Sequence, residues 1–290
     1  MSSNCGITCV GLVWKRLLMC AIAMAAAAAS ISAQQQGNSQ YSPRFGMGHL
    51  PDATVVHGSD VESSAIADDA RCFPWKLSEV RAGTVDVQRL NIPSSAKHEY
   101  EKACEASKKN KPDEVEQHAR AAIEKIEKYP AAWVMLSLSL AEQQKLDDAQ
   151  EACAHAMKAD PAYLPAYLCS AEVSTRKAEW KQVLTASSMA ISLNLGGDSY
   201  AFYYRATAYL HLNNLDEAKK NALQAAQIDV NHSEPSIDLL MAQIYEREGD
   251  KAQAIAQLQL LLKRRPDRQT ADAANQRLAA LESQKPATAQ

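Results

Sequence analysis

Two serine–lysine pairs have the spacing of a catalytic motif. Ser94 precedes Lys97, and Ser174 precedes Lys177, each as S-x-x-K. In some acyl-transfer enzymes the lysine of this motif activates the serine as a nucleophile, but those enzymes also carry a K-T-G segment, which this sequence lacks. A helix cap at Ser94 or Ser95, and a place at the end of a helix for Ser174, explain both pairs better. Neither pair predicts a nucleophile.

Metal binding and acid–base catalysis find equally little support. The 7 histidines show no paired ligand spacing, and Cys153 and His155 stand two residues apart in a helical pattern, so their side chains point in different directions. Asp147-Asp148 and Asp216-Glu217 resemble paired acids, but each pair begins a helix, where negative charge complements the helix dipole. The sequence also lacks a phosphate-binding glycine loop. It therefore predicts no catalytic residue, no metal site and no cofactor.

The composition indicates an all-α protein. Of the 290 residues 47% are hydrophobic, yet only 3 are Phe and 10 are Gly. Abundant alanine suits closely packed helices, and the scarcity of β-branched runs argues against a β sandwich or barrel. The formal net charge of −3 offers no concentrated positive patch of the kind that binds nucleic acid. We therefore expect no nucleic-acid partner.

The N-terminus has the three parts of a secretory signal peptide. Lys15 and Arg16 precede the uncharged run LLMCAIAMAAAAAS, and small residues follow up to Ala33. We expect cleavage near Ala33, which removes residues 1–33, leaves no stable membrane span and exports the chain to the periplasm or the medium. The apolar run is shorter than the ~20 residues of a spanning helix. Retention as an anchor and a lipid on Cys20 are the alternatives.

Export bears on the cysteines. Cys72, Cys104, Cys153 and Cys169 remain after cleavage, in a compartment where disulfides form. Four cysteines allow three pairings, and the sequence does not choose among them. All except Cys72 fall within helical patterns, which favours buried free thiols.

The segment 34–93 differs from the rest of the chain. Its first part, QQQGNSQYSPRFGMGHLPD, is rich in Gln, Gly, Ser and Pro, so we predict a mostly disordered segment. The alternation over residues 84–87 suits a short strand, or an extended stretch against the first helix. Phe73 and Trp75 are expected to dock on that helix too. Residues 284–290 are predicted to be a disordered tail.

From residue 94 onward the pattern is helical and recurs. The stretch from Trp133 to Pro161 reads W-x2-L-S-x2-L, eight residues, A-x3-C, seven residues, P. A small residue on the first helix, and a small or apolar residue on the second, recur along the chain at steps of 34, 34, 35 and 36 residues. A small residue allows two helices to approach closely. The recurring positions are Ala103, Ser137, Ala171, Ala206 and Ala242 on the first helix, and Val115, Ala149, Val183, Ala218 and Ala254 on the second.

This pattern resembles the tetratricopeptide repeat, which places an aromatic residue and a Leu-Gly pair on one helix and Ala, Phe and Pro on the next. The resemblance implies an all-α solenoid at residues 94–283, a right-handed superhelix of about five helical hairpins plus a C-terminal capping helix. The copies lie near 96–129, 130–163, 164–197, 199–232 and 235–268. Trp133, Tyr167 and Phe202 fill the aromatic position, whereas Glu99 and Asp238 replace it in the outer copies. The second helix of the first copy is expected to be slightly long.

The resemblance further implies a concave groove, lined by first helices, that binds a peptide or protein segment. Its mixed apolar and acidic character disfavours the clamp for acidic chaperone tails, and suggests a partner with apolar and basic character. The residues placed along it are Tyr100, Cys104, Lys108, Val134, Leu138, Glu142, Leu168, Glu172, Arg176, Tyr203, Thr207, His211, Leu239, Gln243 and Arg247.

We therefore expect a non-enzymatic adaptor or scaffold in the bacterial periplasm or cell envelope. One alternative is an accessory or maturation subunit of an envelope enzyme complex. Another is a hydrolase that uses residues 34–93, against which the lack of a nucleophile–base pair argues. The identity of the partner and the oligomeric state stay open.

Overall fold

The computed structural model describes residues 72–75, 91–194 and 197–283, all within one compact unit that spans residues 57–290. The expected signal peptide, the expected strand at 84–87 and the C-terminal tail lie outside the described residues. Within these described ranges, no helix is both long and apolar enough to cross a membrane.

Eleven helices and no strand make up the described part of the chain. They are α4 (Ser94–Lys108), α5 (Pro112–Lys125), α6 (Pro130–Glu142), α7 (Leu146–Ala159), α8 (Leu164–Arg176), α9 (Trp180–Leu193), α10 (Ser199–His211), α11 (Leu215–Ile228), α12 (Pro235–Glu248), α13 (Lys251–Lys263) and α14 (Arg268–Ser283).

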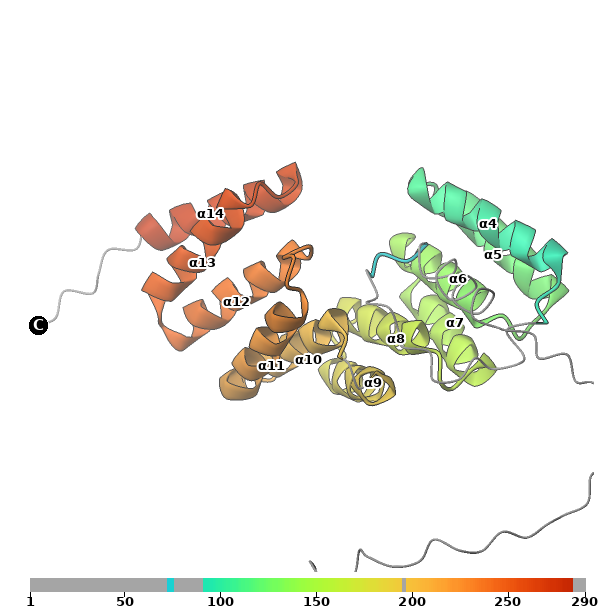
Figure 1. The fold of residues 1–290 in the computed structure, drawn as a ribbon, viewed down its shortest axis with the longest axis horizontal. Helices are drawn as coiled ribbons and strands as arrows, with labels where there is room; N and C mark the ends of the chain where they lie inside the picture. Colours follow the sequence, from blue (N-terminus) through green and yellow to red (C-terminus); the bar gives the residue numbers. More distant parts are fainter. Residues whose placement is uncertain (1–71, 76–90, 195–196, 284–290) are drawn as a thin grey trace, which may run out of the picture. The chain divides into compact units, whose positions relative to one another are not determined.

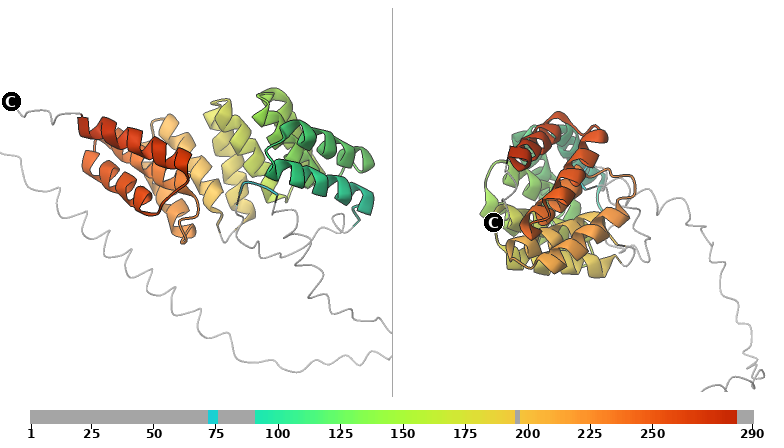
Figure 2. Two further views of the ribbon diagram at one scale, coloured as in Figure 1. Left: turned by 90° about the horizontal axis from the view of Figure 1, so that it is seen from above. Right: turned by 90° about the vertical axis from the view of Figure 1, so that its left-hand side faces the viewer.

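The helices form five antiparallel hairpins, and α14 packs against the last of them. Each helix contacts its neighbours in the chain, and the first helices α4, α6, α8, α10 and α12 also contact one another in order (Figure 1). Figure 2 shows the same succession of hairpins from two further directions. The predicted solenoid of about five hairpins with a capping helix is therefore confirmed. Such a stack buries a continuous apolar surface that no single hairpin buries alone.

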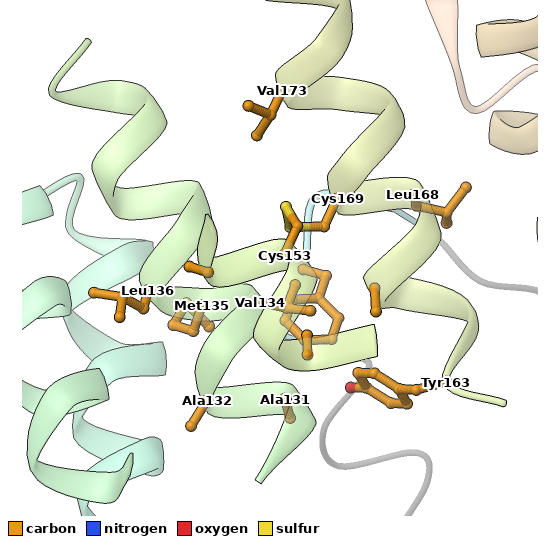
Figure 3. Close-up of a cluster of buried hydrophobic side chains, with 14 of the residues drawn as sticks. Ala131, Ala132, Val134, Met135, Leu136, Cys153, Tyr163, Leu168, Cys169 and Val173 are labelled. Atoms are coloured by element: carbon orange, nitrogen blue, oxygen red, sulfur yellow. A yellow bond between two sulfur atoms is a disulfide. The ribbon is translucent and has the colours of Figure 1, made fainter. Parts of the chain in front are cut away.

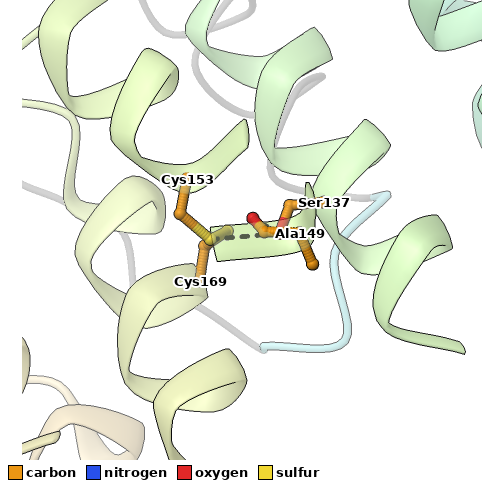
Figure 4. Close-up of a disulfide and its surroundings, with 4 residues drawn as sticks. All are labelled: Ser137, Ala149, Cys153 and Cys169. Carbon is orange, nitrogen blue, oxygen red and sulfur yellow. Dashed lines mark hydrogen bonds between the residues drawn. A yellow bond between two sulfur atoms is a disulfide. The ribbon is translucent and has the colours of Figure 1, made fainter. Parts of the chain in front are cut away.

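The recurring small residues lie where the two helices of each hairpin meet. All five first-helix positions, from Ala103 to Ala242, are fully buried, and the second-helix positions are at most 4% exposed. In the second hairpin the Ser137 hydroxyl donates to the carbonyl oxygen of Ala149 at 2.7 Å (Figure 4). The two recurring positions of one copy are thus in direct contact, which explains why a bulky side chain is excluded there.

Two expectations about helix ends are wrong. Ser94 does not cap α4, because the N-cap residue is Pro93 and Ser94 already lies in the first turn. The second helix of the first copy is not long: α5 ends at Lys125, since Ile126 is extended. Tyr129 then packs against Tyr100, with 5.2 Å between the ring centroids. Caps do form at later second helices, where Asn214 and Asp250 accept backbone N–H groups.

Each hairpin turn contains one residue in the left-handed backbone conformation. The residues are Asn110, Gln144, Ala178, Asn213 and Gly249, with φ between 54° and 81°. They follow the same 34-, 34-, 35- and 36-residue steps as the small residues. The turn geometry is thus part of the repeat, although only the last copy uses glycine for it.

We expect Ala178→Gly to raise the free energy of unfolding by about 0.5–1 kcal/mol, because the Cβ atom of a left-handed residue clashes with its own backbone. The reverse change, Gly249→Ala, should lower it by about 1 kcal/mol. An added Cβ at Gly249 meets no atom within 4 Å, so only the backbone opposes it. Urea unfolding of both variants tests this, and a less stable Ala178→Gly variant would contradict it.

The aromatic position of the repeat anchors the loop before its own helix. The Trp133 indole donates to the carbonyl oxygen of Glu127 at 2.8 Å, and the Tyr167 hydroxyl donates to that of Pro161 at 2.9 Å. Both acceptors lie six residues upstream. In the outer copies, where an acid replaces the aromatic residue, the acid instead bonds to the second helix nineteen residues downstream. Glu99 bonds to His118, and Asp238 bonds to Gln257.

The Glu99 carboxylate makes the stability of the first hairpin depend on acid pH. Hydrogen bonds from His118 (2.8 Å) and Lys102 (3.0 Å) lower the pKa of Glu99 from 4.5 to about 2. A depressed folded-state pKa contributes stability above the unfolded pKa, and that contribution is lost as the pH falls from about 4.5 towards 2.

We expect the difference in melting temperature between the wild type and Glu99→Gln to be constant above about pH 5.5 and to vanish towards pH 2. Glu101→Gln, which changes a carboxylate that is 72% exposed, serves as the control and should leave the wild-type pH curve unchanged. Parallel curves for the wild type and Glu99→Gln would contradict the assignment.

Two disulfides are present, so the expectation of buried free thiols is wrong. Cys72 bonds to Cys104 in α4, and Cys153 in α7 bonds to Cys169 in α8 (Figure 4). The helical pattern did not exclude these bonds, because Cys153 and Cys169 lie on different helices that face each other, and Cys72 lies outside the helices. The second bond links two successive hairpins.

The apolar core is unevenly divided along the stack. The largest cluster of buried side chains runs from Phe73 to Ala208, and Figure 3 shows a part of it with Val134, Met135 and Leu168. Two smaller clusters follow, one between α10 and α12 and one between α12 and α14. The N-terminal hairpins therefore share one core, whereas the C-terminal ones pack pairwise.

Candidate functional site

A cavity of about 590 Å³ opens along the first helices. It lies across the C-terminal halves of α4, α6 and α8 and the N-terminal ends of α10 and α12. Apolar, aromatic and charged side chains share the lining. Its charged residues are Lys108, Lys111, Arg176, Glu142, Glu172 and Glu234.

Residues 72–75 form part of the cavity wall, although they precede the first hairpin (cyan in Figure 1). The Trp75 side chain is only 2% exposed, and its indole N–H donates to the hydroxyl oxygen of Tyr204 at 3.0 Å. The Tyr200 hydroxyl contacts the Pro74 carbonyl oxygen at 3.3 Å. Trp75 does dock on the repeats, with its hydrogen bond to α10 and not to the first helix as expected, and the Phe73 ring packs beside it. Cys72 is bonded to Cys104 in α4.

A network of hydrogen bonds joins this segment to the charges of the cavity. The Tyr204 hydroxyl, which accepts from Trp75, donates to Glu172 at 2.7 Å. Glu172 also accepts from the Arg176 Nε at 2.8 Å, and Arg176 donates to Glu142 at 2.6 Å. The network therefore connects α6, α8 and α10.

The network and burial shift the pKa values of Arg176 and Tyr204. Burial opposes the charge of Arg176, but the hydrogen bonds to Glu172 and Glu142 outweigh it and raise the pKa of the guanidinium. Burial, and then the charge of Glu172, raise the pKa of Tyr204 well above its usual value. Tyr204 therefore keeps its proton, donates a hydrogen bond to Glu172 and accepts one from Trp75.

The structure brings together six of the residues predicted to line the groove. Lys108, Leu138, Glu142, Glu172, Arg176 and Tyr203 all line the cavity.

The other predicted residues lie elsewhere. Val134 and Leu168 are fully buried in the core (Figure 3), and Tyr100 packs on Tyr129. Cys104 is disulfide-bonded, and Thr207 donates to the carbonyl oxygen of its own helix at Tyr203.

Three of the remaining predicted residues contact side chains away from the cavity, and Gln243 is half-buried on α12. His211 stacks on Trp180 at 3.8 Å, Leu239 packs against the last core cluster, and Arg247 bonds to Asn213. The spacing of the first helices therefore predicted binding residues along the whole stack, whereas the residues that line the cavity lie in only part of it.

Sequence reasoning missed several lining residues, chiefly Tyr200, Tyr204 and Met135. Tyr204 lies next to the predicted Tyr203, and a helical pattern does not distinguish which of two adjacent tyrosines faces a cavity. Residues 72–75 carry no period that would place them. Their aromatic pair was the single signal that they dock on the repeats.

The residues that resembled catalytic motifs have structural environments. Cys153 is disulfide-bonded, and the His155 ring stacks on Trp133 at 4.3 Å. The acidic pairs at Asp147 and Asp216 lie in the first turns of α7 and α11, as expected. Lys177 bonds to Asp147 in α7 at 2.7 Å, and Ser174 lies in α8.

We expect Ser174→Ala to raise the free energy of unfolding by about 1 kcal/mol. The Ser174 hydroxyl is fully buried and has no hydrogen-bond partner among the described residues, which is an unfavourable state. Ser137→Ala is the matched control: it removes the bond to Ala149 and should lower the same free energy by about 1 kcal/mol. Equal losses in urea titrations of both variants would contradict the environment assigned to Ser174.

The described helices form a helical-hairpin solenoid with a cavity along its first helices. The family model of the tetratricopeptide repeat matches residues 130–163 and 239–268, which are the second and fifth hairpins. These two hairpins therefore match the tetratricopeptide repeat, and the described helices have the fold of that family. This fold is consistent with a scaffold for protein–protein interaction.

Solved structures support the fold. A tetratricopeptide protein of Thermus thermophilus, TTC0263, is 18% identical, with 64% of this chain and 98% of that chain covered and a TM-score of 0.55. PilF of Pseudomonas aeruginosa is 14% identical (64% and 88% covered, TM-score 0.54). A tetratricopeptide protein of Parabacteroides merdae is 18% identical (66% and 74% covered, TM-score 0.51). No curated protein sequence gives a significant match.

Proposed function

We propose that the protein is an exported adaptor that binds a segment of a partner protein in the cavity between α4, α6, α8 and α10. The observation that carries this proposal is that a short non-helical stretch of polypeptide already docks on the repeats and forms one wall of the cavity. Residues 72–75 insert an aromatic side chain and present a backbone carbonyl to a tyrosine, which are the contacts that a bound peptide makes.

The charges that line the cavity suit a partner of mixed character. Arg176 is paired with Glu142 and Glu172, whereas Glu234 accepts from the Tyr200 hydroxyl at 2.6 Å. A dense positive cluster for an acidic tail is not among the described lining residues. A partner segment with apolar and basic side chains therefore fits best.

Site-specific photo-crosslinking tests the binding site. A photo-reactive residue at Ser107, which lines the cavity and is exposed, should trap a defined partner in cells. The same residue at Gln224, exposed on α11 and away from the cavity, is the matched control and should not. Identical adducts from both positions, or none from Ser107, would contradict the proposal.

Two observations support export. The N-terminus has the composition of a signal peptide, and the chain forms two disulfides, which persist mainly in oxidising compartments. Fractionation followed by N-terminal sequencing should find a chain that starts near Gln34, with its four remaining cysteines resistant to alkylation. Alkylated thiols in a cytosolic, full-length chain would count against export.

A further inference from the structure

The Trp75 indole fills a buried site in the wall of the cavity. Trp75 is buried against α10, where its N–H donates to Tyr204. The Phe73 ring lies 5.8 Å from the Trp75 ring and covers it from within the same segment. The Tyr204 hydroxyl donates its hydrogen bond to Glu172, so its oxygen is left as an acceptor for the side chain in the Trp75 position.

This arrangement selects tryptophan. Tryptophan combines a large apolar ring with a single N–H donor and no acceptor, which matches a buried hydroxyl oxygen whose proton is already committed. Phenylalanine would leave the oxygen of Tyr204 without its donor, and a second hydroxyl would compete for Glu172. Arg176 holds Glu172 in place, so the acceptor is preorganised by α8 and α10.

The occupant comes from outside the repeats and is held by one covalent bond. Cys72, three residues before Trp75, is bonded to Cys104 in α4. A tether this short gives an effective concentration on the order of millimolar, which favours the resident segment over a free ligand. Without that bond, the segment is connected to α4 only by the longer stretch of chain between Trp75 and Ser94. Its effective concentration at the site then falls, and a free ligand competes better.

We propose that the Trp75 site is the recognition site for a tryptophan in the partner segment, and that residues 72–75 are its resident competitor. This inference rests on the proposed function. A dithiol reductant opens the site by exchange: two electrons pass to the Cys72–Cys104 bond, two thiols form there, and the reductant becomes a disulfide. The partner's tryptophan then replaces Trp75 on Tyr204.

Peptide binding to the full chain tests the proposal. The probe is a labelled peptide SFPWKL, which copies residues 72–77 with serine for Cys72, and its affinity is measured by fluorescence polarisation. Trp75→Ala should bind it at least about tenfold more tightly than the oxidised wild type, because the competitor is removed. Cys72→Ser and dithiol treatment should each move the wild type in the same direction. The peptide SFPAKL should bind to none of them.

A second pair of variants tests the indole hydrogen bond. In the Trp75→Ala background, Tyr204→Phe should weaken SFPWKL binding about fivefold, which corresponds to one ordinary hydrogen bond. Tyr209→Phe, on the same helix but not in the cavity lining, is the control and should have no effect. Should Trp75→Ala unfold, as judged by circular dichroism, Trp75→Phe replaces it, since it keeps one aromatic ring and removes the part of the indole that carries the N–H.

The outcomes separate the two proposals. The tryptophan-site proposal is overturned if a folded Trp75→Ala variant does not bind SFPWKL. It is also overturned if this variant and the oxidised wild type bind the peptide equally well. If photo-crosslinking at Ser107 still traps a partner in that case, the adaptor function stands without it. Failure of both experiments removes both.

Discussion

The double variant Cys153→Ala/Cys169→Ala is expected to lose about 3 kcal/mol of unfolding free energy. The bond closes a loop with a sequence separation of 16 residues, and cross-linking a loop of that length restricts the unfolded chain by about this amount. Both sulfurs are fully buried in the largest core cluster. The bond also ties α7 to α8, so its loss weakens the contact between two hairpins and not one hairpin alone.

Urea unfolding, followed by circular dichroism, measures this effect. Wild-type protein should shift towards the double variant when a reducing agent is added. A variant that lacks Cys72, Cys104, Cys153 and Cys169 is the control, and reducing agent should not change its midpoint. If the double variant unfolds at the wild-type midpoint, the bond contributes no stability in solution.

The second large effect is expected at Asp238, which takes the aromatic position in the last hairpin. Its carboxylate accepts from Gln257 at 2.6 Å and forms an ion pair with Arg264 at the end of α13. The Asp238 side chain is only 6% exposed and that of Arg264 24%. Asp238→Ala leaves a largely buried guanidinium without its partner, so we expect a loss of about 2–3 kcal/mol in unfolding free energy.

A surface ion pair provides the control. Asp272→Ala removes a carboxylate that is 64% exposed and lies 3.8 Å from Arg268, and should change stability by less than about 0.5 kcal/mol. In a double-mutant cycle, Asp238→Ala combined with Arg264→Ala should cost clearly less than the sum of the single variants. Additive losses would show that the two side chains do not interact.

The repeat could be predicted from the sequence because one physical requirement recurs in every copy. Only a small side chain fits where two helices cross closely, and the steps from Ala103 to Ala242 record that requirement without any knowledge of the structure. The hydrogen bonds by which Glu99 and Asp238 replace the aromatic residue were not predictable. Each depends on a partner nineteen residues away, which no repeat consensus specifies.

The cavity was predictable only in part, because the first helices are buried to different degrees along their length. Val134, Leu138 and Glu142 share one face of α6, yet Val134 is in the core while the other two line the cavity. Helical spacing assigns all three to the same face. The packing of the neighbouring hairpins and of residues 72–75 decides which end of that face is covered. Residues 72–75 are positioned by the Cys72–Cys104 disulfide, and the sequence alone did not predict that pairing.

The two disulfides also make the chain mechanically asymmetric. No cysteine follows Cys169 in the sequence, so α10 to α14 carry no cross-link. Under a pulling force, these last helices can lengthen to their full contour, whereas the residues between Cys153 and Cys169 add nothing to the extension. The two disulfide loops therefore keep their length under load, whereas every helix from α10 onward can be drawn out.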